Sequence, residues 1–148
     1  MHLAIDGYGG NSNKLDNEDS IYGFLDAYPE KIGMTKISTP HVYRHEAIDT
    51  IDSGVSGFVL IAESHVSIHT FPNRKYVNID VFSCKDFDLK KAVIELKKMF
   101  KLDRVRAWAL DRGLEYSDIA TAKQEVNFER SRLIEDAPRG DSGTLIDN

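Results

Sequence analysis

The chain is poor in cysteine, since Cys84 is the only one among its 148 residues. A single thiol excludes an internal disulfide framework and is typical of proteins in a reducing compartment. Long apolar stretches are missing as well: the longest uninterrupted run is the short segment 58–62, far below the roughly 20 residues of a membrane-spanning helix. The amino terminus lacks the basic start and apolar core of a signal peptide. We therefore expect a soluble, cytoplasmic protein with no membrane partner.

Excess positive charge is also absent. Twenty-four acidic residues outnumber nineteen basic ones, which leaves a formal net charge of −5, so we expect no nucleic-acid partner. The hydrophobic share of 41% and the charged share of 29% are close to the averages of soluble globular proteins. A chain of this length can bury a core without disulfides or a structural metal. These features indicate one compact domain.

Hydrophobic periodicity predicts six strands and two helices in the first 110 residues. Strands are expected near residues 3–5, 36–43, 56–62, 64–71, 76–83 and 105–109, and helices over 17–31 and 87–101. The strand at 56–62 is apolar enough to be buried, and the polar segment 44–53 is expected to be a loop. Pro29 should end the first helix, and Asp86 or Asp88 should cap the second. This order predicts an α+β fold, a two-layer α/β sandwich in which a mostly antiparallel sheet carries helices on one face.

The strands between residues 53 and 84 carry more polar side chains than a plain core would need. These are Ser56, Glu63, Ser64, His65, Ser67, His69, Asp80 and Cys84. Sequence patterns break in this way at functional sites. In the strand at 64–71 the two histidines and Ser67 share one face, because side chains alternate along a strand.

Three kinds of chemistry fit these residues. A metal site would use His65, His69, Asp80 and Cys84. Two histidines four residues apart in a strand are separated by roughly 13 Å, too far for ligands that each lie about 2 Å from one zinc ion, so we expect no metal. A nucleophilic cysteine would pair Cys84 with His69 across the sheet. A lone cysteine is, however, more often a small buried hydrophobic residue.

The third chemistry starts at the bond between Glu63 and Ser64. A serine hydroxyl can attack the carbonyl of the preceding peptide bond and exchange the amide for an ester. Removal of the serine α-proton then expels the upstream chain and leaves a dehydroalanine, which hydrolyses to an amino-terminal pyruvoyl group. Composition alone does not favour this chemistry.

The segment 54–72, GVSGFVLIAESHVSIHTFP, resembles the signature of the prokaryotic S-adenosylmethionine decarboxylase family, and NIDVFSC at 78–84 matches as well. The resemblance implies a self-processing proenzyme. Cleavage between Glu63 and Ser64 would give a β chain, 1–63, and an α chain, 64–148, and Ser64 would become the pyruvoyl group. The order of elements agrees over residues 1–112, which we expect to be the catalytic domain, followed by a partly disordered extension, 113–148.

The resemblance also implies the roles of single residues. His69 would be the base of the maturation elimination, Ser56 would assist it, and Cys84 would return a proton after decarboxylation. The pyruvoyl ketone would form a Schiff base with the α-amine of a small amino-acid substrate, and the protein would supply positioning and proton transfer.

Strand geometry bears on assembly. Ser64 and His69 are five residues apart in one strand, roughly 16 Å, so His69 cannot serve its own Ser64 without a sharp bend. We expect His69 and Ser56 of a symmetry partner to complete each site. The resemblance likewise implies a homodimer with composite sites, in which the two sheets form a larger sandwich; a dimer of dimers stays open.

The sequence departs from the family at positions that recognise substrate. The family motif Trp-Pro-Glu is replaced by Phe71, Pro72 and Asn73. Phe71 can still stack on a ring or a sulfonium cation, and Asn73 can still bind a hydroxyl group without a charge. We expect S-adenosylmethionine as the substrate, for spermidine biosynthesis. Arginine or ornithine remains an alternative, as does an uncleaved, non-catalytic homologue.

Overall fold

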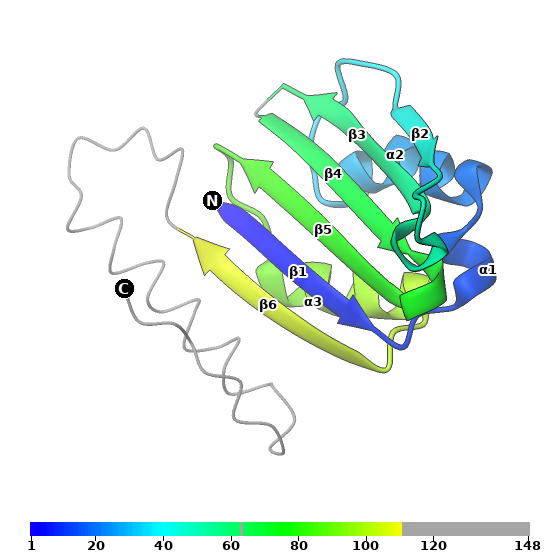
Figure 1. Cartoon of the computed structure of the whole chain (residues 1–148). Helices are drawn as coiled ribbons and strands as arrows, with labels where there is room; N and C mark the ends of the chain where they lie inside the picture. The colour runs from blue at the N-terminus through cyan, green and yellow to red at the C-terminus, as the bar shows by residue number, and fades with distance from the viewer. Residues whose placement is uncertain (63, 111–148) are drawn as a thin grey trace.

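The structure, a computed structural model, describes residues 1–62 and 64–110. Its six strands are β1 (His2–Tyr8), β2 (His41–His45), β3 (Gly54–Ile61), β4 (Ser64–Phe71), β5 (Tyr76–Ser83) and β6 (Arg104–Leu110). They form one sheet in the order β2-β3-β4-β5-β1-β6, and every neighbouring pair is antiparallel (Figure 1).

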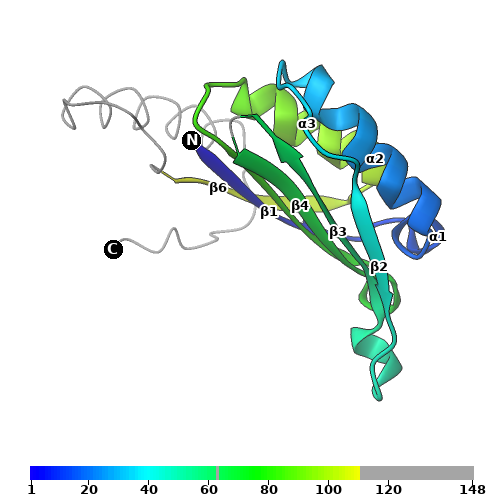
Figure 2. The same cartoon turned by 90° about the horizontal axis from the view of Figure 1, so that it is seen from above.

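Two helices, α2 (Glu18–Lys31) and α3 (Leu89–Phe100), lie on the same side of this sheet, as Figure 2 shows. The short helix α1 (Ser12–Leu15) and two 3-10 turns, η1 (Thr50–Asp52) and η2 (Pro72–Arg74), complete the described part of the chain. The predicted α+β sandwich with helices on one face is confirmed. Within the described residues, no helix is long and apolar enough to span a membrane.

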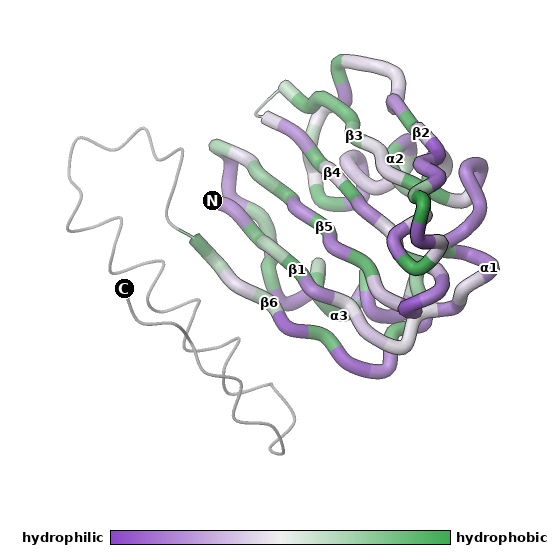
Figure 3. Tube along the Cα trace, viewed as in Figure 1, coloured by the Kyte–Doolittle hydropathy of each residue, from purple (hydrophilic) through white to green (hydrophobic). Residues whose placement is uncertain are grey.

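The core lies between the helices and one face of the sheet. Alternate residues of each strand point inward, so that valine and isoleucine side chains of β4 and β5 are fully buried, Val66, Ile68, Val77, Ile79 and Val81 among them. The helices contribute one apolar stripe each, which includes Ile21, Leu25, Leu89, Leu96 and Phe100. Hydrophilic and hydrophobic residues therefore alternate along the strands (Figure 3).

The helix ends follow their side-chain caps. Asn17 accepts a hydrogen bond from Ser20 N at 2.7 Å and starts α2, and Asp88 accepts one from Lys91 N at 2.9 Å and starts α3, as predicted. Pro29 does not end α2, because the helix continues to Lys31. The chain leaves it at Gly33, whose φ of +77° suits a residue without a β-carbon.

Two strand predictions need correction. The strand expected at 36–43 begins only at His41, directly after Pro40, because proline has no N–H to donate to a ladder; Lys36 makes an isolated bridge. The strand expected to be buried, β3, has only one buried face: Phe58 and Leu60 are 40% and 42% exposed. Within residues 1–62 and 64–110 the helices cover one side of the sheet and no element covers the other side, which carries these residues and is called the open face below.

The open face is ordered in rows, because antiparallel register places residues directly opposite each other. One row runs Tyr43–Ser56–His69–Asn78–Asp6–Arg106, and another runs Leu60–His65–Phe82–His2–Leu110. The chain's histidines, at positions 2, 41, 45, 65 and 69, all belong to the open face. It also carries several aromatic rings. A sheet face of this composition is unusual for a surface that meets only water.

Candidate active site

Ser64 begins β4, after the turn that leaves β3. Its register partners are Ile61 on β3 and Ser83 on β5. The hydroxyl Oγ lies 3.2 Å from Nδ1 of the next residue, His65, and both side chains are half-buried. The His65 ring stands edge-on to Phe82, with 5.6 Å between the ring centroids. Glu63, on the other side of the predicted cleavage bond, lies outside the described residues.

Cys84 follows β5 directly and is therefore the neighbour of the residue paired with Ser64. The residue stands just outside the strand, because β5 ends at Ser83, and the thiol is exposed. The alternative of a small buried hydrophobic residue is therefore wrong. The next residue, Lys85, is also exposed, and its Nζ donates to the carbonyl of Gly33 at 3.0 Å.

Ser83, the last residue of β5, is fixed by several hydrogen bonds directly before Cys84. Ser83 is fully buried; its N donates to Met1 O at 2.9 Å, and its carbonyl accepts from the terminal ammonium group at 2.5 Å. Its hydroxyl accepts from Lys85 N at 2.9 Å and lies 3.4 Å from the sulfur of Met34. The position of Cys84 relative to Ser64 is thus fixed by a buried anchor.

Ser56 and His69 meet near the opposite end of β4. They are register partners, and Nδ1 of His69 lies 2.9 Å from Oγ of Ser56. Asn78 stands opposite His69 on β5, and its amide donates to Asp6 Oδ1 and to the hydroxyl of Tyr76, each at 2.6 Å. The structure therefore brings together the two residues predicted to act in processing, and separates both from Ser64 of the same chain by about five strand residues, roughly 16 Å.

The strand register also bears on the nucleophilic cysteine and the metal site considered from the sequence. His69 pairs with Asn78, six residues before Cys84, so His69 and Cys84 of one chain do not meet across the sheet. In the part of the chain that the structure describes, no group of three or more histidine, cysteine or acidic side chains is arranged to hold a metal ion.

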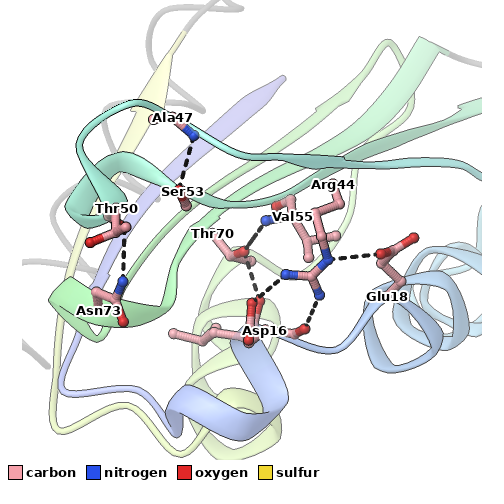
Figure 4. A network of polar contacts seen from close by, with 10 residues as sticks. Asp16, Glu18, Arg44, Ala47, Thr50, Ser53, Val55, Thr70 and Asn73 are labelled. Atoms are coloured by element: carbon pink, nitrogen blue, oxygen red, sulfur yellow. Dashed lines mark hydrogen bonds and ion pairs between the residues drawn. The ribbon is translucent and has the colours of Figure 1, made fainter.

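Of the predicted substrate-binding residues, Phe71 is the last residue of β4 and Asn73 lies in η2, both beyond His69 in the chain. The Phe71 ring packs against Tyr76 at 5.6 Å, and the Arg74 guanidinium lies 6.0 Å from its centroid. Asn73 donates from Nδ2 to the carbonyl of Thr50 at 2.8 Å and so joins η2 to η1 (Figure 4). Neither residue approaches Ser64 of its own chain.

Burial, followed by a hydrogen bond to Asp6, raises the pKa of Tyr76 to about 12. The neutral phenol is therefore the stable form beside Asn78 and the Ser56–His69 pair. This polar support was not predicted from the sequence, although Asp6 and Asn78 are polar residues inside strands, the signal that drew attention to β4.

Thr70 is a second residue that the sequence analysis did not single out. It is buried, and its Oγ1 accepts from Val55 N at 2.9 Å and reaches the carbonyl of Leu15 at 2.8 Å. Nearby, Arg44 of β2 binds Asp16 and Glu18 with distances of 2.7 and 3.0 Å (Figure 4). These bonds tie β2, β3 and β4 to the α1–α2 connection and hold the strands that carry Ser56 and His69.

Comparison with known proteins places these residues in a family context. Residues 1–113 match the family model described as S-adenosylmethionine decarboxylase. The S-adenosylmethionine decarboxylase proenzyme of Archaeoglobus fulgidus is 35% identical over 113 residues, which cover 76% of this chain and 96% of the relative. That of Clostridium botulinum strain Loch Maree is 37% identical over 98 residues, 66% of this chain and 79% of the relative.

A solved structure is similar as well. The crystal structure of the adenosylmethionine decarboxylase from Aquifex aeolicus superimposes with a TM-score of 0.66 and 29% sequence identity. The alignment covers 79% of this chain and 92% of that one. The fold that carries Ser64, His69 and Cys84 is therefore similar to that of this solved structure.

Proposed function

Because the chain belongs to the S-adenosylmethionine decarboxylase family, we propose that it is a self-processing proenzyme that becomes a pyruvoyl-dependent S-adenosylmethionine decarboxylase. The observation that carries this proposal is the sequence motif Glu63-Ser64-His65, whose serine begins β4, with Cys84 next to the strand partner of Ser64. The product, decarboxylated S-adenosylmethionine, would supply aminopropyl groups for spermidine. We place this reaction in the cytoplasm.

Ser64 lies where the chain can be cut without loss of the fold, as formation of a pyruvoyl group at this residue requires. β4 is paired with β3 on one side and β5 on the other, so a break between Glu63 and Ser64 cuts the connection of a hairpin and leaves both ladders intact. The new terminus at residue 64 would stay where it is. The two pieces, 1–63 and 64–148, would thus stay associated through these strand ladders, with the catalytic domain at 1–112.

Two side chains of this chain transfer protons in the proposed reactions, His69 as a base and Cys84 as an acid. His69, hydrogen-bonded to Ser56, is the base that removes the α-proton of Ser64 during maturation. A pyruvoyl group at Ser64 would supply an electron sink for the electron pair that departing carbon dioxide leaves on the substrate α-carbon. Cys84 would then return a proton to that α-carbon. Its exposed thiol and its buried anchor at Ser83 suit a proton donor with a fixed position.

The open face supports a homodimer. Tyr43, Phe58, Leu60 and Leu110 are 40–63% exposed on it, and burying such side chains is favourable by about 25 cal/mol per Å². Packing two open faces together would also bring His69 and Ser56 of one subunit toward the end of β4 at which Ser64 lies in the other, which a single chain cannot do. Each site would then be composite, and two dimers can join as a tetramer.

Phe71 and Asn73 are proposed to bind substrate from the His69 side of such a composite site. The curated relatives compared above carry the name S-adenosylmethionine decarboxylase proenzyme, so this substrate is preferred over arginine or ornithine. The amide of Asn73 would need to exchange its bond to Thr50 for a bond to the ligand, or use its carbonyl oxygen.

The intact mass of the purified chain tests the proposal directly. The wild-type protein should separate into two fragments split between Glu63 and Ser64. The larger fragment should carry at its amino terminus a ketone that reacts with phenylhydrazine. Ser64→Ala should stay uncut. Carbon dioxide should be released from carboxyl-labelled S-adenosylmethionine and not from labelled arginine or ornithine. An uncut wild-type chain would favour a non-catalytic homologue.

A further inference from the structure

Ser64 and His65 form a contact inside one chain that the proposed roles leave unused. Oγ of Ser64 lies 3.2 Å from Nδ1 of His65. The two residues are neighbours in sequence, so the contact lies within one chain and requires no partner. A hydroxyl beside an unprotonated imidazole nitrogen donates its hydrogen to that nitrogen, which is the arrangement of an activated serine nucleophile.

His69 cannot take this role within the same chain. It lies five residues further along β4, roughly 16 Å away, and its Nδ1 is occupied by Ser56. Maturation, however, needs proton transfer twice: once from the Ser64 hydroxyl, when the amide is exchanged for an ester, and once from the Ser64 α-carbon, when the ester is eliminated. The two transfers start from different atoms of Ser64.

We propose that His65 is the catalytic base of the first transfer, so that ester formation occurs within one chain and only the elimination needs His69. This inference rests on the proposed self-processing function. Nδ1 of His65 takes the proton from Ser64 Oγ, which bonds to the carbonyl carbon of Glu63. The C–N bond of the amide breaks, and the proton passes to the leaving nitrogen, which becomes the α-amine of Ser64. No atom or electron is gained or lost.

The surroundings of His65 suit a fixed base. Its ring stands edge-on to Phe82, at an interplanar angle of 67°, and Phe82 is in turn flanked by His2 at 5.6 Å. His2 is held by Asp80, with 2.9 Å between Nε2 and Oδ1. This row of side chains on β4, β5 and β1 restricts the orientation of the imidazole. A base that is already oriented toward the hydroxyl loses less entropy on reaching the transition state.

The experiment uses the full chain with His69→Ala, in which elimination is blocked and the ester accumulates. Neutral hydroxylamine cleaves an ester but not an amide, so the rate at which it cuts the chain between residues 63 and 64 measures ester formation by intact mass. Introducing His65→Ala into this chain should slow the cleavage by about 100-fold or more. Added imidazole should restore part of the rate in His65→Ala and have no effect where His65 is present.

Two further variants separate basicity from hydrogen bonding and from folding. His65→Asn places an amide oxygen near the position of Nδ1 without a basic group, and should be as slow as His65→Ala. His41→Asn changes a histidine that stacks on Phe58 elsewhere on the open face and should form ester at the unaltered rate. Thermal unfolding of each variant shows that it is folded.

The outcomes distinguish this inference from the proposed function. Ester formation at the same rate with and without His65, in a chain whose wild-type form processes itself, overturns the role of His65 alone. A rate in His65→Asn equal to that with His65 also overturns it, because a hydrogen bond would then suffice. Absence of both cleavage and ester in the wild-type chain overturns the proposed function. A first-order rate that does not change on dilution supports formation of the ester within one chain.

Discussion

Ser56 and His69 face each other across β3 and β4, with 2.9 Å between Oγ and Nδ1, while Ser64 lies at the far end of β4. The pair is supported by a row of polar residues that continues through Asn78 to Asp6. A single subunit therefore holds a hydrogen-bonded Ser56–His69 pair that lies too far along β4 to reach Ser64, the serine proposed to be processed. This separation is the physical reason for the proposed composite site.

Complementation between two inactive variants tests the composite site. Neither Ser64→Ala nor His69→Ala should complete processing alone. In a mixed dimer, the His69→Ala chain still has Ser64 and would receive His69 and Ser56 from its Ser64→Ala partner. We expect mass spectrometry to show cleavage of the His69→Ala chain after the two proteins are mixed or co-expressed.

A matched control removes the complementing group from the helper. The double variant Ser64→Ala/His69→Ala should not restore cleavage of the His69→Ala chain, and Ser64→Ala/Ser56→Ala should restore it poorly. If His69→Ala processes normally by itself, His69 is not the base. If mixing fails although mixed dimers form, the pair serves its own chain and the site is not composite.

A charge on the open face should disrupt the proposed dimer. Phe58→Asp places a carboxylate among the exposed side chains of that face, where pairing would bury it without a partner. We expect the dimer to dissociate at micromolar concentrations in analytical ultracentrifugation, and processing to become incomplete. Ile94→Asp is the control, because Ile94 is 58% exposed on α3, on the other side of the sheet, and should remain dimeric. Equal behaviour of the two variants would show that the open face is not the interface.

The sequence predicted most reliably where a local pattern alone decides the structure. The alternation of β4 and β5 assigned the two faces correctly, and Asp88 was one of the two expected caps. Errors occurred where distant contacts decide. The ladder that pairs His41 with Phe58 of β3 sets where β2 runs, beside the local effect of Pro40. Only the placement of both helices on one side reveals that Phe58 is exposed.

The candidate site shows the same limit. The motif identifies Ser64, His69 and Cys84, and the spacing of the first two already excludes a direct contact in one strand. The hydrogen bond between Ser56 and His69 depends on register, which periodicity does not give. The buried hydroxyl of Thr70 between β3 and α1 is likewise invisible in the sequence, where a threonine in a strand is ordinary.

Two glycine substitutions should change stability in opposite directions. A β-carbon on Gly54 would lie 1.9 Å from the carbonyl oxygen of Thr70, so Gly54→Ala should push β3 from β4 and lower the free energy of unfolding by about 1–3 kcal/mol. Gly23 lies inside α2, and a β-carbon there meets nothing within 4 Å. Gly23→Ala should raise the free energy of unfolding by about 0.5–1 kcal/mol, since alanine loses less backbone entropy. Urea unfolding measures both, and a loss of stability in both would contradict this account.

Ionisation of Tyr76 should weaken the fold at high pH. Its pKa is raised to about 12 in the folded chain, against about 10 for an exposed tyrosine, so the folded state holds the proton more tightly than the unfolded state. The resulting stabilisation is complete below pH 10 and is lost as the pH rises toward 12. Tyr76→Phe cannot ionise, so its free energy of unfolding should fall less steeply over this range, although the lost hydrogen bond from Asn78 lowers its stability at neutral pH. Burial also raises the pKa of Tyr28, which leaves a common alkaline slope in both proteins. Urea unfolding at several pH values from 8 to 12 compares the slopes, and parallel curves would show that the phenol of Tyr76 titrates alike in both states.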